Sequence, residues 1–444
     1  MNKFFKGTLL LALAAFAGEC LEFLVNMILA RELGERGLGM YMSILPTIFL
    51  IVLLASFELP ISISKFIAEK DKKYHQSMLN QVIKWTVIFT VILLPVAILI
   101  IPFVGVFDQY HPYLRWVVII FIPIVSFSSI TRGFFMGKQQ MGKIATYNFL
   151  RRMIQLLLLV FLYQFFQFNT ETAVFIALCT LIGSEIVVFL YLLYMFIIQY
   201  QLIRKDSSEK MNGSKVRKSL LAVSIPTTAL RVFHALTHAV EPFLIKAALL
   251  QAGVSGVIAT EHFGMLAGIA MTIGFFPAFI AHSFLIMLIP TVSKAYVEKD
   301  TEQLRNLLQQ VFFITILYGV PAVAFFYFFA EPLTSKFFHS IDAAVYLQML
   351  WPFFLLQYFI IPMQAYLIGL GLMKEALYHF IWSTIVSFSL MYVLGSMPVF
   401  QMDGVIIGMN AGATILFLMH YLTICQKINV SILLAPSKRF KLKS

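Results

Sequence analysis

The sequence predicts an all-α membrane protein with about twelve transmembrane helices. Hydrophobic residues make up 60% of the 444 residues and charged residues only 12%, whereas a soluble domain carries about 25% charged residues. The apolar residues gather in long segments, and one helix needs about 20 such residues to cross a bilayer. Polar and mostly basic segments separate them. The composition therefore favours a polytopic membrane protein over a soluble enzyme.

The expected spans follow one another along the whole chain. A secretory signal peptide is an alternative interpretation of the N-terminus, with Lys3 and Lys6 as its basic end. The apolar pattern continues to Ala30, however, so we interpret this segment as the first transmembrane helix. The expected spans are residues 7–30, 38–60, 82–106, 113–136, 146–166, 172–200, 219–250, 263–290, 308–330, 343–370, 376–397 and 403–425.

Basic residues lie mostly on one side of the predicted bundle. That side holds both termini and the loops near residues 61–84, 131–152, 201–218, 291–305 and 371–375. Cytoplasmic loops carry an excess of Lys and Arg, so both termini are predicted to be cytoplasmic. This asymmetry also accounts for the net charge of +12. Because the basic residues are dispersed over separate loops, we expect no nucleic-acid partner.

An internal repeat divides the chain in half. Residues 64–71 and 293–300 share five identities at equal spacing, each near a proline that we expect to end a helix, Pro60 and Pro290. Six spans separate the copies, so two parallel six-helix lobes are expected around a central cavity. The predicted parts are a first lobe (1–200), a cytoplasmic linker (201–218), a second lobe (219–426) and a basic cytoplasmic tail (427–444).

Ionisable residues inside spans are costly and usually face a cavity or one another. Two helices carry such residues at spacings of three and four, which places them on one helical face. A structural role, with each charge paired inside its own lobe, is the alternative for both sets, and Glu185, His282 and His379 are interpreted as packing residues. The substrate or cavity candidates are Arg231, His234, His238 and Glu241 in the seventh span, and Glu19, Glu22 and Asn26 in the first.

Other motifs point to packing and not to catalysis. The glycines at 404, 408 and 412 form a close-packing face in the last span, and Gly133 with Gly137 is a weaker example. The segment from Gly133 to Lys138 is one residue short of a phosphate loop. The three cysteines have no metal-ligand spacing. We therefore expect no catalytic residue, no metal and no cofactor.

Several segments resemble a known family. They are residues 58–69, the stretch 31–41, Met136-Gly137 and residues 289–294. Together they resemble the bacterial polysaccharide and lipid-oligosaccharide flippases, and most closely the stage V sporulation protein B group. These are relatives of the lipid II flippases within the multidrug/oligosaccharidyl-lipid/polysaccharide exporter superfamily. The resemblance covers nearly the whole chain.

The resemblance implies a multi-pass protein of the bacterial cell membrane whose lobes alternate access to a central cavity. Its implied partner is an undecaprenyl-pyrophosphate-linked saccharide for cell-envelope, peptidoglycan or spore polysaccharide synthesis. Arg231 best fits a role in holding the pyrophosphate, and Lys65 is the second candidate. Two departures stand out: Glu19 and Glu22 are acidic, and twelve spans are expected where lipid II flippases have fourteen.

Two other functions remain open. The first is a cation-coupled multidrug exporter of the same fold, with Glu19 or Glu22 as the site for a coupling ion, H⁺ or Na⁺. Arg231, His234 and His238 in the seventh span disfavour a cationic drug, because positive charge there would repel it. The second is a membrane scaffold of envelope or spore assembly that transports nothing, although a scaffold has no evident need for buried charge.

Overall fold

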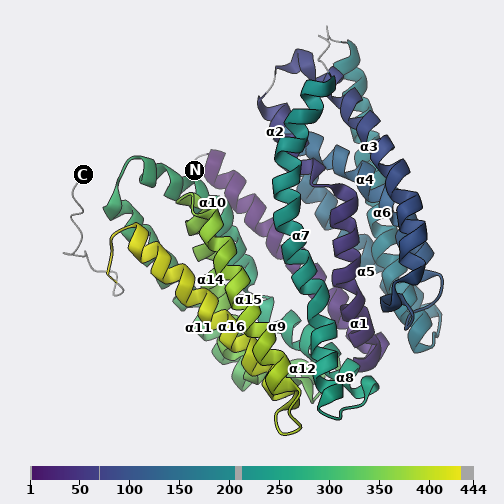
Figure 1. Cartoon of the computed structure of the whole chain (residues 1–444), viewed down its shortest axis with the longest axis vertical. Coiled ribbons are helices and arrows are strands. Elements are labelled where there is room, and N and C mark those ends of the chain that lie inside the picture. The colour runs from purple at the N-terminus through teal and green to yellow at the C-terminus, as the bar shows by residue number, and fades with distance from the viewer. Residues whose placement is uncertain (1–2, 70, 206–212, 432–444) are drawn as a thin grey trace. The chain divides into compact units, whose positions relative to one another are not determined.

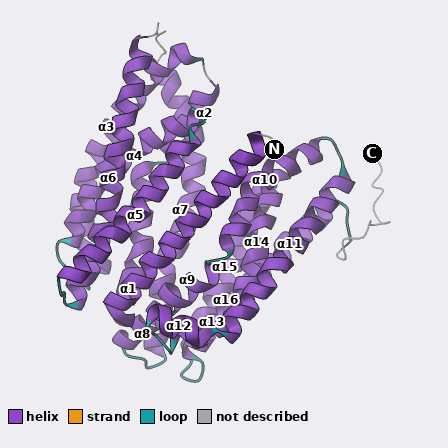
Figure 2. Cartoon of the chain, turned by 180° about the vertical axis from the view of Figure 1, so that it is seen from behind, coloured by secondary structure: helices purple, strands orange, loops and turns teal. Residues whose placement is uncertain are grey.

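The computed structural model describes residues 3–69, 71–205 and 213–431, which form helices joined by short connections (Figure 2). Within these ranges there is no β-strand. Eleven helical segments of the described residues are long and apolar enough to cross a membrane. This confirms the prediction of an all-α, multi-pass membrane protein with about twelve spans. Part of the predicted linker (206–212) and most of the predicted tail (432–444) lie outside the described residues.

The first two expected spans lie in α1 (Lys3–Ser56), which consists of two helices that meet at a kink at Gly34. Gly34 has φ 63° and ψ 179°, a backbone conformation that favours glycine because it has no Cβ. The following helix, α2 (Leu59–Glu69), corrects one expectation, since residues 61–69 were predicted as loop. Pro60 lies in the first turn of α2, where its missing N–H costs no intrahelical hydrogen bond, so it starts a helix and does not end one.

The remaining elements are long helices and a few short connecting helices. One of the long helices, α10, contains Pro290, which was also expected at a helix end. In the first half the elements are α3 (Lys72–Ile100), η1 (Ile101–Phe103), η2 (Gly105–Phe107), α4 (Leu114–Gly137), α5 (Met141–Phe165), α6 (Thr170–Lys205) and α7 (Gly213–Gln251). In the second half they are α8 (Gly256–Phe263), the π-helical η3 (Gly264–Ala270), α9 (Met271–Phe275), α10 (Ala278–Val297), α11 (Thr301–Phe328), α12 (Ala330–Phe338), α13 (Ala343–Met349), α14 (Trp351–Gly369), α15 (Met373–Gly395) and α16 (Gln401–Lys427).

The chain forms two compact units. The N-terminal unit contains residues 32–242, and the C-terminal unit contains residues 1–31 and 243–444. These boundaries differ from the expected lobes, which were continuous in sequence. The first span belongs with the second half of the chain, and most of α7 belongs with the first half.

In the N-terminal unit, α4 contacts α2, α3, α5 and α6, which run alongside one another (Figures 1 and 2). Glycines let α4 approach α2 closely. A Cβ on Gly133 would lie 2.9 Å from Cα of Pro60, and one on Gly137 would lie 2.7 Å from Cβ of Ile67. The Gly133–Lys138 segment thus serves helix packing, as its spacing predicted.

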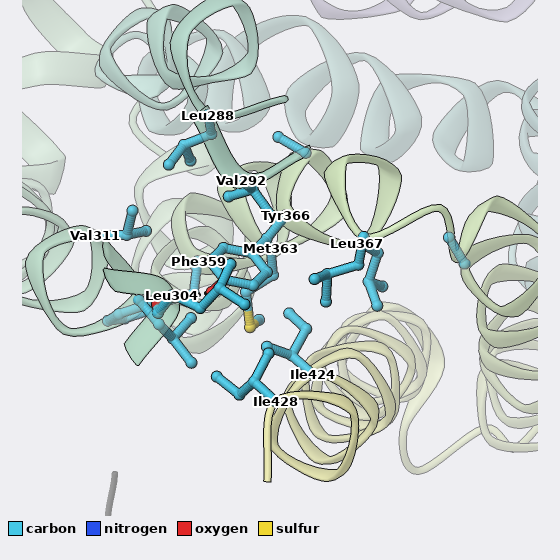
Figure 3. Close-up of a cluster of buried hydrophobic side chains, with 14 of the residues drawn as sticks. Leu288, Val292, Leu304, Val311, Phe359, Met363, Tyr366, Leu367, Ile424 and Ile428 are labelled. Atoms are coloured by element: carbon cyan, nitrogen blue, oxygen red, sulfur yellow. Dashed lines mark hydrogen bonds between the residues drawn. The ribbon is translucent and has the colours of Figure 1, made fainter. Parts of the chain in front are cut away.

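The C-terminal unit repeats this arrangement. Gly369 of α14 packs on α10, where an added Cβ would lie 2.8 Å from Cβ of Val292. Around this contact, side chains from α10, α11, α14 and α16 form a buried apolar cluster (Figure 3). The predicted glycine face of α16 packs on α15: a Cβ on Gly408 would lie 2.6 Å from the backbone N of Met391.

Candidate functional site

The site in the N-terminal unit is centred on a helix break. Phe57 and Glu58, between α1 and α2, have φ values of 46° and 48°. Residues other than glycine rarely adopt this conformation, and when they do it is often at functional sites. The eleven residues of α2 extend about 16 Å from the break towards the predicted cytoplasmic end. Glu58 lies inside the expected second span, residues 38–60, near the cytoplasmic end of that span.

Arg231 of α7 forms an ion pair with Glu58. Its Nη1 atom lies 3.0 Å from Oε1 and 3.1 Å from Oε2 of the carboxylate. The Glu58 side chain is 5% exposed, whereas that of Arg231 is 60% exposed. The carboxylate is therefore almost completely buried, while much of the guanidinium remains accessible.

A second polar contact joins the same two helices. The hydroxyls of Ser62 in α2 and Ser224 in α7 are hydrogen-bonded to each other, and Ser62 also donates to the carbonyl oxygen of Glu58 at 3.2 Å. Both serines are buried. Two polar contacts therefore fix α7 against the helix break inside the N-terminal unit.

Glu58 was absent from the predicted site. It belongs to the segment that carries the family resemblance, directly before Leu59-Pro60, and it was assigned to the end of the second span. A carboxylate inside a span is costly and usually has a partner or a function, but Glu58 stood at the expected end of its helix. The sequence signal was therefore present, but the expected helix boundary concealed it.

The other predicted residues of α7 continue the polar stripe. Nδ1 of His238 lies 3.5 Å from Oε2 of Glu241. His234 is partly buried and has an edge-to-face contact with Phe233. Arg231 and His238 thus each have a carboxylate partner within the N-terminal unit.

The predicted residues of the first span belong to the C-terminal unit. Asn26 donates a hydrogen bond to Oγ1 of Thr272 in α9 at 3.2 Å, next to the π-helical η3. Glu19 of α1 interacts electrostatically with His282 of α10. Glu22, also on α1, is exposed. These three residues therefore lie in a different unit from Arg231.

Lys65 lies on α2 with an exposed side chain. Two residues further along α2, Ile67 borders a cleft of about 790 Å³ in the N-terminal unit. Its polar wall residues are Asp71, His75, Lys138, Gln139, Gln140 and Gln199. Lys138 donates to Oε1 of Gln199 at 3.2 Å. The predicted cytoplasmic end of the unit therefore offers a polar opening that contains one lysine and one aspartate.

Comparison with known proteins places this geometry in a family. The family model described as "Polysaccharide biosynthesis protein" matches residues 4–295, and the MatE model matches residues 266–393. The chain is 54% identical to Sporulation protein YkvU of Bacillus subtilis (strain 168), over 99% of both chains. It is 31% identical to Stage V sporulation protein B of the same organism, over 97% of this chain and 85% of the relative.

Solved structures share the fold. An inward-facing multidrug resistance MATE family transporter superposes with a TM-score of 0.70 at 19% identity, covering 93% of this chain and 96% of that one. A MOP superfamily transporter from Pyrococcus furiosus gives a TM-score of 0.65 at 19% identity, covering 96% of each chain.

The class follows from these findings: the chain is a multi-pass membrane protein that shares its fold with MATE family transporters of the MOP superfamily. Within that class it belongs to the polysaccharide biosynthesis protein family, as the sequence resemblance indicated.

Proposed function

We propose that this protein moves an undecaprenyl-pyrophosphate-linked saccharide across the bacterial inner membrane by alternating access. Membership of the polysaccharide biosynthesis family supports this cargo class. The names of the two Bacillus subtilis relatives support a role in spore formation. The observation that carries the proposal is the Arg231–Glu58 ion pair at the helix break.

The chemistry of the guanidinium supports pyrophosphate binding. Arginine has five N–H donors in a planar fork that suits phosphate oxygens. Glu58 occupies one nitrogen of Arg231, and the side chain is 60% exposed. The remaining donors are available for a second anion. Glu58 then holds the guanidinium in place and neutralises it while no cargo is bound.

In this mechanism the headgroup is drawn from the cytoplasm by basic groups near Lys65 and Lys294, which occupy equivalent positions in the repeat. The polar cleft beside α2 offers hydrogen-bonding groups on this route. The pyrophosphate then engages Arg231, and rocking of the lobes releases the cargo outside.

The test is reconstituted transport in proteoliposomes. Fluorescent undecaprenyl-pyrophosphate saccharides and ethidium are followed in vesicles that contain the same protein preparation. We expect the lipid to be moved and ethidium export to stay at the rate of protein-free vesicles. Ethidium export driven by a proton or sodium gradient, without lipid movement, would overturn the proposal.

One observation favours a second candidate, the cation-coupled multidrug exporter. The C-terminal unit contains two polar pairs that involve the first span, Glu19 with His282 and Asn26 with Thr272, about two helical turns apart on that span. Such groups suit a proton or sodium ion. They serve equally as the coupling site of a flippase, and the ethidium arm of the same assay separates the two functions.

A further inference from the structure

An apolar pocket that is partly open to the surface adjoins the helix break of the N-terminal unit. Its volume is about 200 Å³. Phe57 and Leu59, the two neighbours of Glu58 in the chain, form part of the wall. The rest of the wall consists of Val82, Trp85, Thr86 and Phe89 from α3, and Leu221 and Ser224 from α7. Glu58 of the ion pair thus lies in the chain between two residues of the wall, and Ser224 of the wall lies about two helical turns before Arg231 in α7.

One group in the wall lacks the partner that its burial requires. Thr86 is 2% exposed, and its hydroxyl has no hydrogen-bond partner among the described residues. Leaving a buried hydroxyl unpaired costs about 1–3 kcal/mol. The hydroxyl oxygen itself is enclosed by protein atoms, so the wall presents an almost wholly apolar surface to a ligand.

The volume limits the size of this ligand. A cavity of about 150 Å³ lined by apolar side chains binds benzene, which has six heavy atoms. A cavity of about 200 Å³ therefore accepts little more than one branched five-carbon unit. In a polyprenyl pyrophosphate, such a unit carries the phosphoester oxygen at its end, directly followed by the anionic groups.

We propose that this cavity binds the first isoprene unit of the polyprenyl chain, next to the pyrophosphate held by Arg231. The inference rests on the proposed function and names the part of the cargo that recognition requires. The cation of Arg231 selects this amphiphile by charge complementarity.

The experiment measures binding to the purified full-length protein. The probes are undecaprenyl pyrophosphate and inorganic pyrophosphate. Leu221→Trp fills the cavity from its rim, because Leu221 is 36% exposed and lines the cavity. Val87→Trp is the matched control on α3, since Val87 is 42% exposed and lies outside the wall. We expect Leu221→Trp to weaken binding of undecaprenyl pyrophosphate at least tenfold and to leave inorganic pyrophosphate unaffected. Val87→Trp should change neither.

A second measurement uses the unaltered protein, so that it does not depend on how a variant folds. A photoreactive polyprenyl pyrophosphate with its diazirine on the first isoprene unit should label the peptide containing Trp85. Excess undecaprenyl pyrophosphate should displace the label. If a phosphatidylglycerol with a photoreactive acyl chain labels this peptide and undecaprenyl pyrophosphate does not displace it, the cavity holds bilayer lipid and the inference is wrong.

The failure of the inference is distinguishable from failure of the proposed function. If Leu221→Trp binds undecaprenyl pyrophosphate as well as the wild type does, while Arg231→Gln does not, only the cavity assignment falls. If both variants bind it like the wild type, the assignment of Arg231 falls as well.

Discussion

Nη1 of Arg231 lies 3.0 Å from Oε1 of Glu58, although 173 residues separate them in the chain. The contact joins α7 to the break between α1 and α2, where two residues other than glycine have left-handed backbone angles. A buried carboxylate needs a partner, and α7 supplies it. The same guanidinium is the group that we assign to the pyrophosphate.

Removing Arg231 should therefore affect stability as well as binding. Arg231→Ala leaves Glu58 buried and unpaired, which we expect to cost about 3 kcal/mol, the lower end for a buried pair because the arginine is largely exposed. The pair Arg231→Gln and Glu58→Gln should lose less than the sum of the single changes. Denaturation in mixed micelles measures all variants. Strict additivity would contradict the ion pair.

The glycine face of α16 gives a prediction about packing. An added methyl on Gly408 would lie 2.6 Å from the backbone of Met391, whereas one on Gly183 of α6 meets no atom within 4 Å. Gly408→Ala should therefore destabilise the protein by about 1–3 kcal/mol. Gly183→Ala, the control, should be neutral or stabilising by up to about 1 kcal/mol. Thermal unfolding in detergent compares them, and equal effects would contradict this packing.

Glu185 is expected to stabilise the N-terminal unit without touching cargo. The phenol of Tyr147 donates to its carboxylate, and Arg151 lies 3.7 Å away. Glu185→Gln should lower the unfolding temperature by several degrees, since a weaker acceptor faces a buried phenol. The affinity for undecaprenyl pyrophosphate should stay within about twofold. A tenfold loss of affinity in a normally folded variant would make Glu185 part of the binding site.

The first span supplies a prediction about coupling. Glu19→Gln removes a charge near His282, and Asn26→Ala removes the hydrogen bond to Thr272. If this cluster binds the coupling ion, Glu19→Gln should abolish the stimulation of lipid movement by a proton or sodium gradient. The rate without a gradient should persist. A variant that responds to both gradients like the wild type would exclude Glu19 from coupling.

The sequence predicted the parts of the fold that depend on local pattern. Apolar runs located the spans, and the glycines at 133, 137 and 408 predicted close helix contacts that the structure confirms. The five identities of the repeat correspond to equivalent packing of α2 on α4 and of α10 on α14. These features depend on helical period and side-chain size, which one sequence displays directly.

The remainder depended on tertiary contacts. The break at Phe57 and Glu58 contains no glycine that would indicate it in the sequence. Its contacts come from α7, through Arg231 and the Ser62–Ser224 hydrogen bond. Pro60 was expected to end a helix, yet it starts one, and proline is compatible with both positions. The first span belongs to the C-terminal unit and most of α7 belongs to the N-terminal unit, and no local sequence pattern indicates this assignment.

The central claim is that Arg231 holds the pyrophosphate of a lipid-linked saccharide during transport. The most direct measurement is the rate at which proteoliposomes move a fluorescent undecaprenyl-pyrophosphate saccharide, compared between Arg231→Gln and Lys246→Gln. Lys246 is the matched control, because it is another cationic residue of the same helix, α7. We predict that Arg231→Gln lowers the rate at least tenfold, whereas Lys246→Gln stays within about twofold of the wild type. Full activity of a correctly folded Arg231→Gln protein would contradict the account.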